Sequence, residues 1–155
     1  MVVRTRPDAA RIRRAVAYFE RNGIDPRVEP PPGTFPSDVL RAPRYTQLTA
    51  TGITSQACSI GVSAYFFYAH VEVIDMANYH TFEGHSGGIG LGDIFGIGVI
   101  YYADLPTLLA TTDFGVFFGA EAGGAMHVTW GTHGNATVGG IGEGLGAFGG
   151  RGSWK

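Results

Sequence analysis

From residue 44 onward, apolar and polar side chains alternate with a period of two, which is typical of half-buried β-strands. The clearest run is 58–70, which continues to residue 74 and is followed by a turn at 75–78. Its alternation predicts one buried face, made of Ile60, Val62, Ala64, Phe66 and Tyr68. The same pattern predicts further strands at 45–51, 79–92, 94–102, 114–119, 125–130, 135–144 and 145–154.

Two stretches follow a helical period instead. Residues 8–22 place Ala9, Ile12, Val16 and Phe19 on one face, with Asp8 as N-cap and Gly23 after the last turn. The stretch 104–111, with Asp104 as cap and Pro106 in the first turn, predicts one short helix. Prolines crowd 24–43, so we expect an extended spacer there. The predicted division is 1–43, an amphipathic helix with a proline-rich linker, and 44–155, a glycine-rich β domain.

Glycine changes this picture. Of the 25 glycines, 21 lie between Gly84 and Gly152, and the pattern GGIGxG occurs at 87–92 and again at 139–144. Four strands, a short helix and four strands, with each half ending in such a segment, predict two related halves that close on each other. The fold class expected is all-β: a closed, Greek-key-like antiparallel barrel of eight strands. Glycine at alternate positions would allow a strongly bent sheet or close contact with bulky neighbours, such as Phe66, Phe67, Phe117, Phe118 and Trp130.

The charge is divided unevenly along the chain. Residues 1–44 carry nine arginines against five carboxylates, whereas 45–155 carry Arg151 and Lys155 against eight carboxylates. The absence of Lys and Arg from 45 to 150 argues against a nucleic-acid-binding surface there. The basic N-terminal region could dock on the acidic remainder, on an acidic partner or on an anionic membrane.

No segment is long and apolar enough to predict a transmembrane helix, and no Sec-type signal peptide is visible. We therefore expect either secretion by a route without a visible signal or a cytoplasmic location. The oligomeric state does not follow from the pattern.

Residues that could carry chemistry are scattered. The glycine segment at 87–92 lacks the lysine and the following helix of a phosphate-binding loop. A metal site at His80, Glu83 and His85 would need a turn, because His80 and His85 point to opposite faces of one extended strand. Ser86 lacks the strand–elbow–helix context of a hydrolase, and Cys58 has no neighbouring cation in sequence. We predict no catalytic, cofactor-binding or metal-ligating residue.

The last two-thirds of the chain resembles the actinobacterial virulence-associated protein (Vap) family. The resemblance rests on Ala64-Tyr65-Phe66-Phe67-Tyr68, on Phe82-Glu83-Gly84 followed by Gly87-Gly88-Ile89-Gly90, on Gly98-Val99-Ile100-Tyr101 before Asp104, on Leu108-Leu109, and on Gly149-Gly150-Arg151-Gly152-Ser153-Trp154. It implies a compact eight-stranded antiparallel barrel with a short connecting helix. It also implies a secreted, non-enzymatic factor that acts on host cells or their membranes. The missing secretion signal and the arginine-rich N-terminal region depart from the family pattern.

Two functions from different classes follow. The first is a non-enzymatic effector or interaction module that acts on a host or partner protein or on a membrane, with the N-terminal helix used for docking or delivery. The alternative is a small hydrophobic-ligand-binding β-barrel of lipocalin or avidin type. An enzyme would need at least two titratable groups converging in a pocket. Whether the interior is filled by side chains distinguishes the first two.

Overall fold

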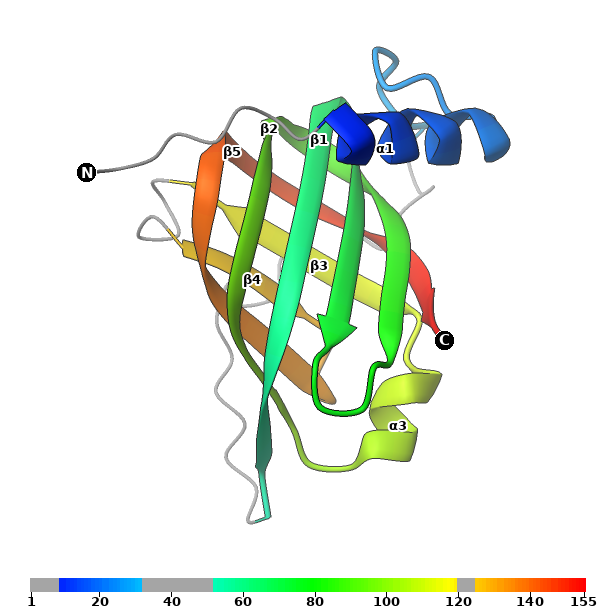
Figure 1. The fold of residues 1–155 in the computed structure, drawn as a ribbon. Coiled ribbons are helices and arrows are strands. Elements are labelled where there is room, and N and C mark those ends of the chain that lie inside the picture. Colours follow the sequence, from blue (N-terminus) through cyan, green and yellow to red (C-terminus); the bar gives the residue numbers. More distant parts are fainter. Residues whose placement is uncertain (1–8, 32–51, 120–124) are drawn as a thin grey trace, which may run out of the picture.

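The computed structural model describes residues 9–31, 52–119 and 125–155 (Figure 1). Both predicted helices are confirmed, and the turn predicted at 75–78 follows directly after the first strand. The strand predicted at 45–51 and most of the proline-rich spacer lie outside the described residues. The elements in chain order are α1 (Ala9–Arg21), β1 (Thr54–Asp75), β2 (Thr81–Tyr102), α3 (Leu105–Ala110), β3 (Asp113–Phe118), β4 (Ala125–Thr129) and β5 (Gly134–Trp154).

Seven of the eight predicted strands fall within the described residues, which contain five strands. They form one antiparallel sheet in the order β1-β2-β5-β3-β4, with β4 also paired to β5. The predicted breaks near residue 93 and at 144–145 do not interrupt β2 or β5, because the ladder continues through the pairs Gly92↔Gly144 and Leu91↔Leu145. Glycine lets these long strands bend without ending, so segments expected as separate strands are two arms of one strand.

The arms explain why the alternation pattern divided β2 and β5 into two predicted strands each. The first part of β5 pairs with β4 and the last part with β3, while β2 pairs with β5 along its whole length. The strand β1, which was predicted as the single run 58–74, also bends into two arms. The two arms of β1 run side by side in Figure 1, but in the described part of the chain the ladder joins β1 to β2 alone. Closure of the sheet into a barrel stays a prediction.

The bend in β1 corrects the predicted buried face. Ile60, Val62 and Ala64 are fully buried as expected, but the register shifts between Phe66 and Tyr68. A bulge of this kind adds one residue to a strand and moves the following side chains to the opposite face. Phe66, with φ of 57°, is consequently 54% exposed. Tyr68 packs on the outside of the sheet, and the core continues through Ala69, Val71 and Val73.

The interior between the front and rear strands is filled by side chains. Phe82 lies at the centre of an aromatic group, with its ring centroid 4.9 Å from that of Phe114 and 5.6 Å from that of Trp130. Phe148 and Phe118 stack nearby with centroids 6.0 Å apart. These large rings are at most 1% exposed, so the space that a ligand-binding barrel would keep open is occupied.

The glycine-rich segments are the inner faces of β2 and β5, which lie next to each other. At Gly90, a Cβ atom would lie 2.7 Å from the Gly146 Cα, from the Leu145 carbonyl oxygen and from the Phe148 ring. The predicted close contact with bulky side chains is therefore present, although Phe148 and Val138 are the main neighbours instead of most of those expected. Glycine is paired with glycine at positions such as Gly90↔Gly146 and Gly96↔Gly140. Because these residues have no side chains, the neighbouring large side chains can lie directly over the backbones of β2 and β5.

Candidate interaction surface

Helix α1 lies across the bend of β1 at one end of the sheet, whereas α3 lies near the opposite end (Figure 1). The apolar face of α1 buries Ala15 and Phe19 against Tyr68, with Ile24, Tyr65 and Phe67 packed around them. The Phe67 amide also donates to the Pro26 carbonyl at 3.3 Å. This apolar group is small and separate from the main core, so docking of α1 rests on few buried side chains.

A group of polar side chains lies between α1 and the sheet. His70 and His85 are directly opposite each other on β1 and β2, as are Glu72 and Glu83. The His70 Nε2 lies 3.1 Å from Glu83 Oε1, and the His85 Nδ1 lies 3.1 Å from the Tyr18 hydroxyl. We call the set of Arg14, Tyr18, Arg21, His70, Glu72, Glu83 and His85 the helix–sheet polar cluster.

Two arginines of α1 complete this cluster. Arg14 lies 3.6 Å from the Glu72 carboxylate, and Arg21 lies 3.9 Å from that of Glu83 while its guanidinium also stands over the Tyr18 ring at 5.4 Å. Both arginine side chains are more than half exposed, so each ion pair by itself adds little to stability. When both histidines are neutral, the charged groups of the cluster are two arginines and two glutamates, so their charges balance.

Burial lowers the pKa of both histidines of the cluster. Desolvation lowers the pKa of His70, whose side chain is 4% exposed, and the contact with Glu83 opposes this only in part. Desolvation and the neighbouring His70 lower the pKa of His85. Burial, followed by the charge of Glu83, raises the pKa of the Tyr18 phenol. The docked arrangement therefore disfavours additional positive charge.

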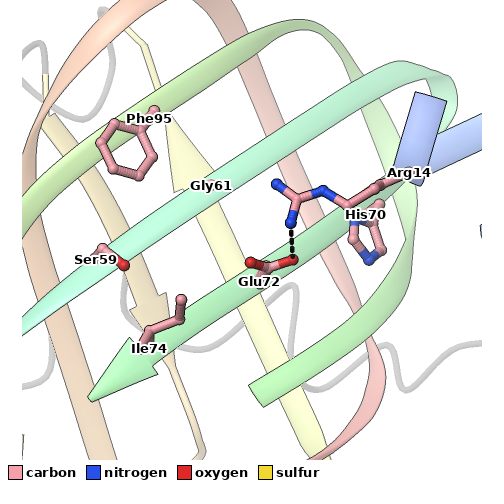
Figure 2. Close-up of a pocket in the computed structure, with 7 residues that line it drawn as sticks. All are labelled: Arg14, Ser59, Gly61, His70, Glu72, Ile74 and Phe95. Atoms are coloured by element: carbon pink, nitrogen blue, oxygen red, sulfur yellow. Dashed lines mark ion pairs between the residues drawn. The ribbon is translucent and has the colours of Figure 1, made fainter. Parts of the chain in front are cut away.

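A shallow hollow of about 50 Å³ adjoins the cluster between the two arms of β1 (Figure 2). Ser59 and Gly61 line it from one arm and His70, Glu72 and Ile74 from the other, and Arg14 and Phe95 complete it. Its volume suits one or two water molecules and is far below the several hundred Å³ of an ordinary ligand site. In the described ranges, no three His, Cys, Asp or Glu side chains are grouped so that they could hold a metal ion.

The residues considered from the sequence do not assemble into one site. His80, Glu83 and His85 are not brought together, and the partner of Glu83 is His70 instead. His127 pairs with Thr137 across β4 and β5 at 3.1 Å, and His133 lies exposed in the following turn. Ser86 is fully buried and donates to the Ala69 carbonyl at 3.3 Å. Burial, followed by the charge of Asp75, raises the pKa of the Cys58 thiol to about 12.

The sequence analysis missed an exposed apolar surface on the outside of β2 and β5. Ile89, Leu91, Phe95 and Ile97 alternate along the outer face of β2, and Leu145 pairs with Leu91 from β5. Their exposed fractions are 73%, 56%, 37% and 60% along β2 and 53% for Leu145. We call these five residues the outer apolar patch. The signal was present in the sequence, because between Gly87 and Gly98 four of the five large apolar side chains occupy positions that alternate with glycine, and the fifth, Ile94, is buried.

The outer apolar patch is continuous with the surface on which α1 docks. Leu91 is paired with Tyr65, which packs at the edge of the α1 contact. Small side chains flank the patch farther along, since Phe95 is opposite Gly61 and Ile97 is opposite Ser59 and Gly139. Asp93, which accepts a hydrogen bond from Ser63 at 3.1 Å, interrupts it. Exposed apolar surface of this kind is typical of binding faces.

The helices in the described ranges are too short or too polar to cross a membrane. This finding agrees with the prediction that no transmembrane helix is present.

The arrangement of long bent strands and one short connecting helix is a Vap-like β fold, which confirms the resemblance to that family at the level of structure. The virulence-associated protein VapD of the intracellular pathogen Rhodococcus equi superposes with a TM-score of 0.62 at 23% identity, over 67% of this chain and 99% of VapD. VapB of the same organism gives 0.54 at 21% identity, over 66% and 97%. No protein-family model and no curated protein matches the sequence.

Proposed function

We propose that this chain is a non-enzymatic, virulence-associated interaction module that binds a protein partner through the outer apolar patch. The observation that supports the proposal most directly is the row of large side chains exposed at alternate positions of β2, with Leu145 beside them. Exposing them to water is unfavourable, and a binding partner would cover them. The similarity in fold to VapD and VapB supports a virulence-associated role in general.

An apolar protein surface fits the patch better than an anionic membrane does. Residues 45–150 include no Lys or Arg, so the strands that form the patch supply no cation that would attract acidic headgroups. The one charged side chain in the row along β2 is the carboxylate of Asp93. A mainly apolar centre with a few polar groups is the usual composition of protein–protein interfaces.

The other functions receive less support from the geometry. A lipocalin-like barrel would keep its interior open, but Trp130, Phe148 and their neighbours fill it here. An enzyme would need titratable groups around a space for substrate. His70, Glu83, His85 and Tyr18 do converge, but α1 covers them and the adjacent hollow is small.

The test compares partner capture by the full-length protein and by two multiple variants. In the first, Ile89, Leu91 and Ile97 are each replaced by Ser. In the control, Val28, Met76 and Tyr79, which are 57%, 44% and 80% exposed but lie outside the patch, are replaced by Ser, Ser and Asn. Proteins captured from an animal-cell lysate are identified, purified and returned to each variant for measurement of the Kd.

We expect a purified partner to bind the wild type and the control variant alike and to lose at least about tenfold in affinity, or about 1.4 kcal/mol, with the patch variant. Equal binding by all three would contradict the proposal. Vesicles of phosphatidylcholine, with and without phosphatidylserine, are tested in parallel. If binding to vesicles requires the patch and no captured protein requires it, the partner of the patch is a lipid surface and the protein-partner proposal is wrong.

A further inference from the structure

We propose that α1 is an acid-released cover: protonation of His70 and His85 undocks the helix from β1 and β2 and enlarges the exposed apolar surface. The proposal rests on the helix–sheet polar cluster and not on the identity of any partner. It can therefore fail or succeed separately from the proposed function.

The two histidines are placed so that their charges would add. His70 and His85 are directly opposite each other in the ladder, and the Tyr18 ring contacts both, with centroids 4.7 Å and 5.5 Å away. Like charges at directly opposed sheet positions are destabilising. Both imidazoles lie under a helix that itself carries Arg14 and Arg21 toward the sheet.

Among the described side chains named below, the carboxylates that face the histidines do not outnumber the arginines. From α1 the facing groups are Arg14, Tyr18 and Arg21, and from the sheet they are Glu72 and Glu83. Arg151 of β5 is opposite His85, but its guanidinium pairs with Asp113 at 3.2 Å. Two added protons would thus leave two positive charges in excess under α1, where solvent cannot screen them well.

The direction of the pH effect follows from linkage. The pKa values of His70 and His85 are lowered in the docked state, chiefly by burial, and return toward the ordinary value when α1 leaves. The undocked state therefore binds more protons once the pH falls below the ordinary pKa of histidine. Docking is at full strength above that pKa and weakens as the pH falls toward the lowered values. Protonated His70 would gain an ion pair with Glu83, but desolvation outweighs this gain.

Undocking of α1 would enlarge the exposed apolar surface of the sheet. In the apolar contact between α1 and the sheet, Ala15 and Phe19 of the helix pack against Tyr65, Phe67 and Tyr68. These sheet residues adjoin the outer apolar patch through the Tyr65–Leu91 pair. Release of α1 would join the two areas into one apolar surface and free a basic amphipathic helix.

Hydrogen exchange of the full-length protein tests the proposal without a partner. Amide protection, corrected for intrinsic exchange, is followed for α1, α3 and the β2–β5 ladder from about pH 7.5 to about pH 5, the range in which histidine titrates. We expect α1 to lose protection with a slope approaching about tenfold per pH unit for each proton taken up. The ladder, α3 and the fluorescence of buried Trp130 should stay unchanged.

The matched variant is H70Q/H85Q, which keeps hydrogen-bonding groups but cannot take up the protons. It should keep α1 protected across the whole range. If the double variant does not fold, the single variant H85Q, at the less buried position, takes its place. It removes one of the two protonation sites, so we expect the slope to fall by about half. Protection of α1 in the wild type that persists at the lowest pH would overturn the proposal. Loss of protection in all elements together, or an unchanged slope in H85Q, would overturn it as well.

Discussion

In the glycine-rich middle of β2, residues 88–98, the two faces largely invert the usual relation between burial and side-chain size. On the inner face stand Gly88, Gly90, Gly96 and Gly98, where an added Cβ would collide with β5. On the outer face stand Ile89, Leu91, Phe95 and Ile97, which are largely exposed. An ordinary half-buried strand would place the large apolar residues inside. The inner face of β2 is thus specialised for close approach to β5, and its outer face is available for binding.

Of the two faces, the inner one should be more sensitive to substitution. The largest difference between the faces is expected in the reactivity of a cysteine thiol. Cys58 lies on the inner face of β1 opposite Gly98, and burial holds its pKa at about 12. Since the thiolate is the reactive species, a rise of about three units from the ordinary range lowers its population about a thousandfold near neutral pH.

The matched outer position is Ile97, which is 60% exposed and opposite the neighbouring residue Ser59. In the variant I97C, we expect the new thiol to react with an alkylating reagent at the rate of a free cysteine, while Cys58 reacts only when the protein unfolds. Mass spectrometry of the labelled peptides gives both rates in one sample. Comparable rates at the two positions would show that the inner face is open to solvent.

The next largest effect is expected on stability, when an inner glycine is replaced by a larger residue. In Gly90→Val, the added side chain meets the Gly146 Cα, the Leu145 carbonyl oxygen and the Phe148 ring, each 2.7 Å from the Cβ position. Backbone atoms cannot move aside as a flexible side chain can, so we expect a loss of about 3 kcal/mol in the free energy of unfolding. Urea unfolding measures it.

The control for this substitution is Gly139→Val on the neighbouring strand. Gly139 is exposed, and nothing lies within 4 Å of its Cβ position. We expect a change within about 0.5 kcal/mol there. If both variants lose the same stability, the effect belongs to valine in a glycine-rich strand, and close packing between β2 and β5 is not its cause.

The sequence predicted local structure well and predicted register poorly. Periodicity placed α1 and α3, the Asp104 N-cap that accepts from the Thr107 amide, and the β3–β4 pair. It divided β2 and β5 into two strands each because glycine at a bend resembles glycine at a turn, and only pairing with a neighbouring strand decides between them. The phase change at Phe66 was missed for the same reason, because a bulge depends on the opposite strand.

In the candidate surface, too, some features depend on strand register and others could be recognised from the sequence. The pairs His70↔His85 and Glu72↔Glu83 join residues 11 to 15 positions apart, so they depend on the register of β1 with β2. The arginine-rich helix was recognised from the sequence, and of the three docking surfaces considered for it, the acidic remainder is the one that Arg14 and Arg21 contact, at Glu72 and Glu83. The outer apolar patch could have been found from the sequence alone. The sequence analysis considered the glycine face of these strands and made no prediction for the large residues that alternate with it.

The smallest expected effect is the loss of stability when the outer face is changed. Replacing Leu91 or Ile97 by Thr removes exposed apolar surface and keeps a side chain suited to a strand. We expect the free energy of unfolding to change by no more than about 0.5 kcal/mol in either variant. Urea unfolding should therefore barely distinguish L91T and I97T from the wild type, and solubility should rise because the apolar patch shrinks.

The inner residue Val138 provides the comparison for this prediction. It is 1% exposed and fills the space beside Gly96 and Gly98, so V138T buries a hydroxyl group there. That change should cost about 1 to 3 kcal/mol unless the hydroxyl finds a partner. A loss of this size in L91T or I97T would mean that the patch contributes to the fold. Its exposure would then be no argument for binding, whereas a negligible loss leaves the large outer side chains without a structural role and strengthens the assignment of a partner.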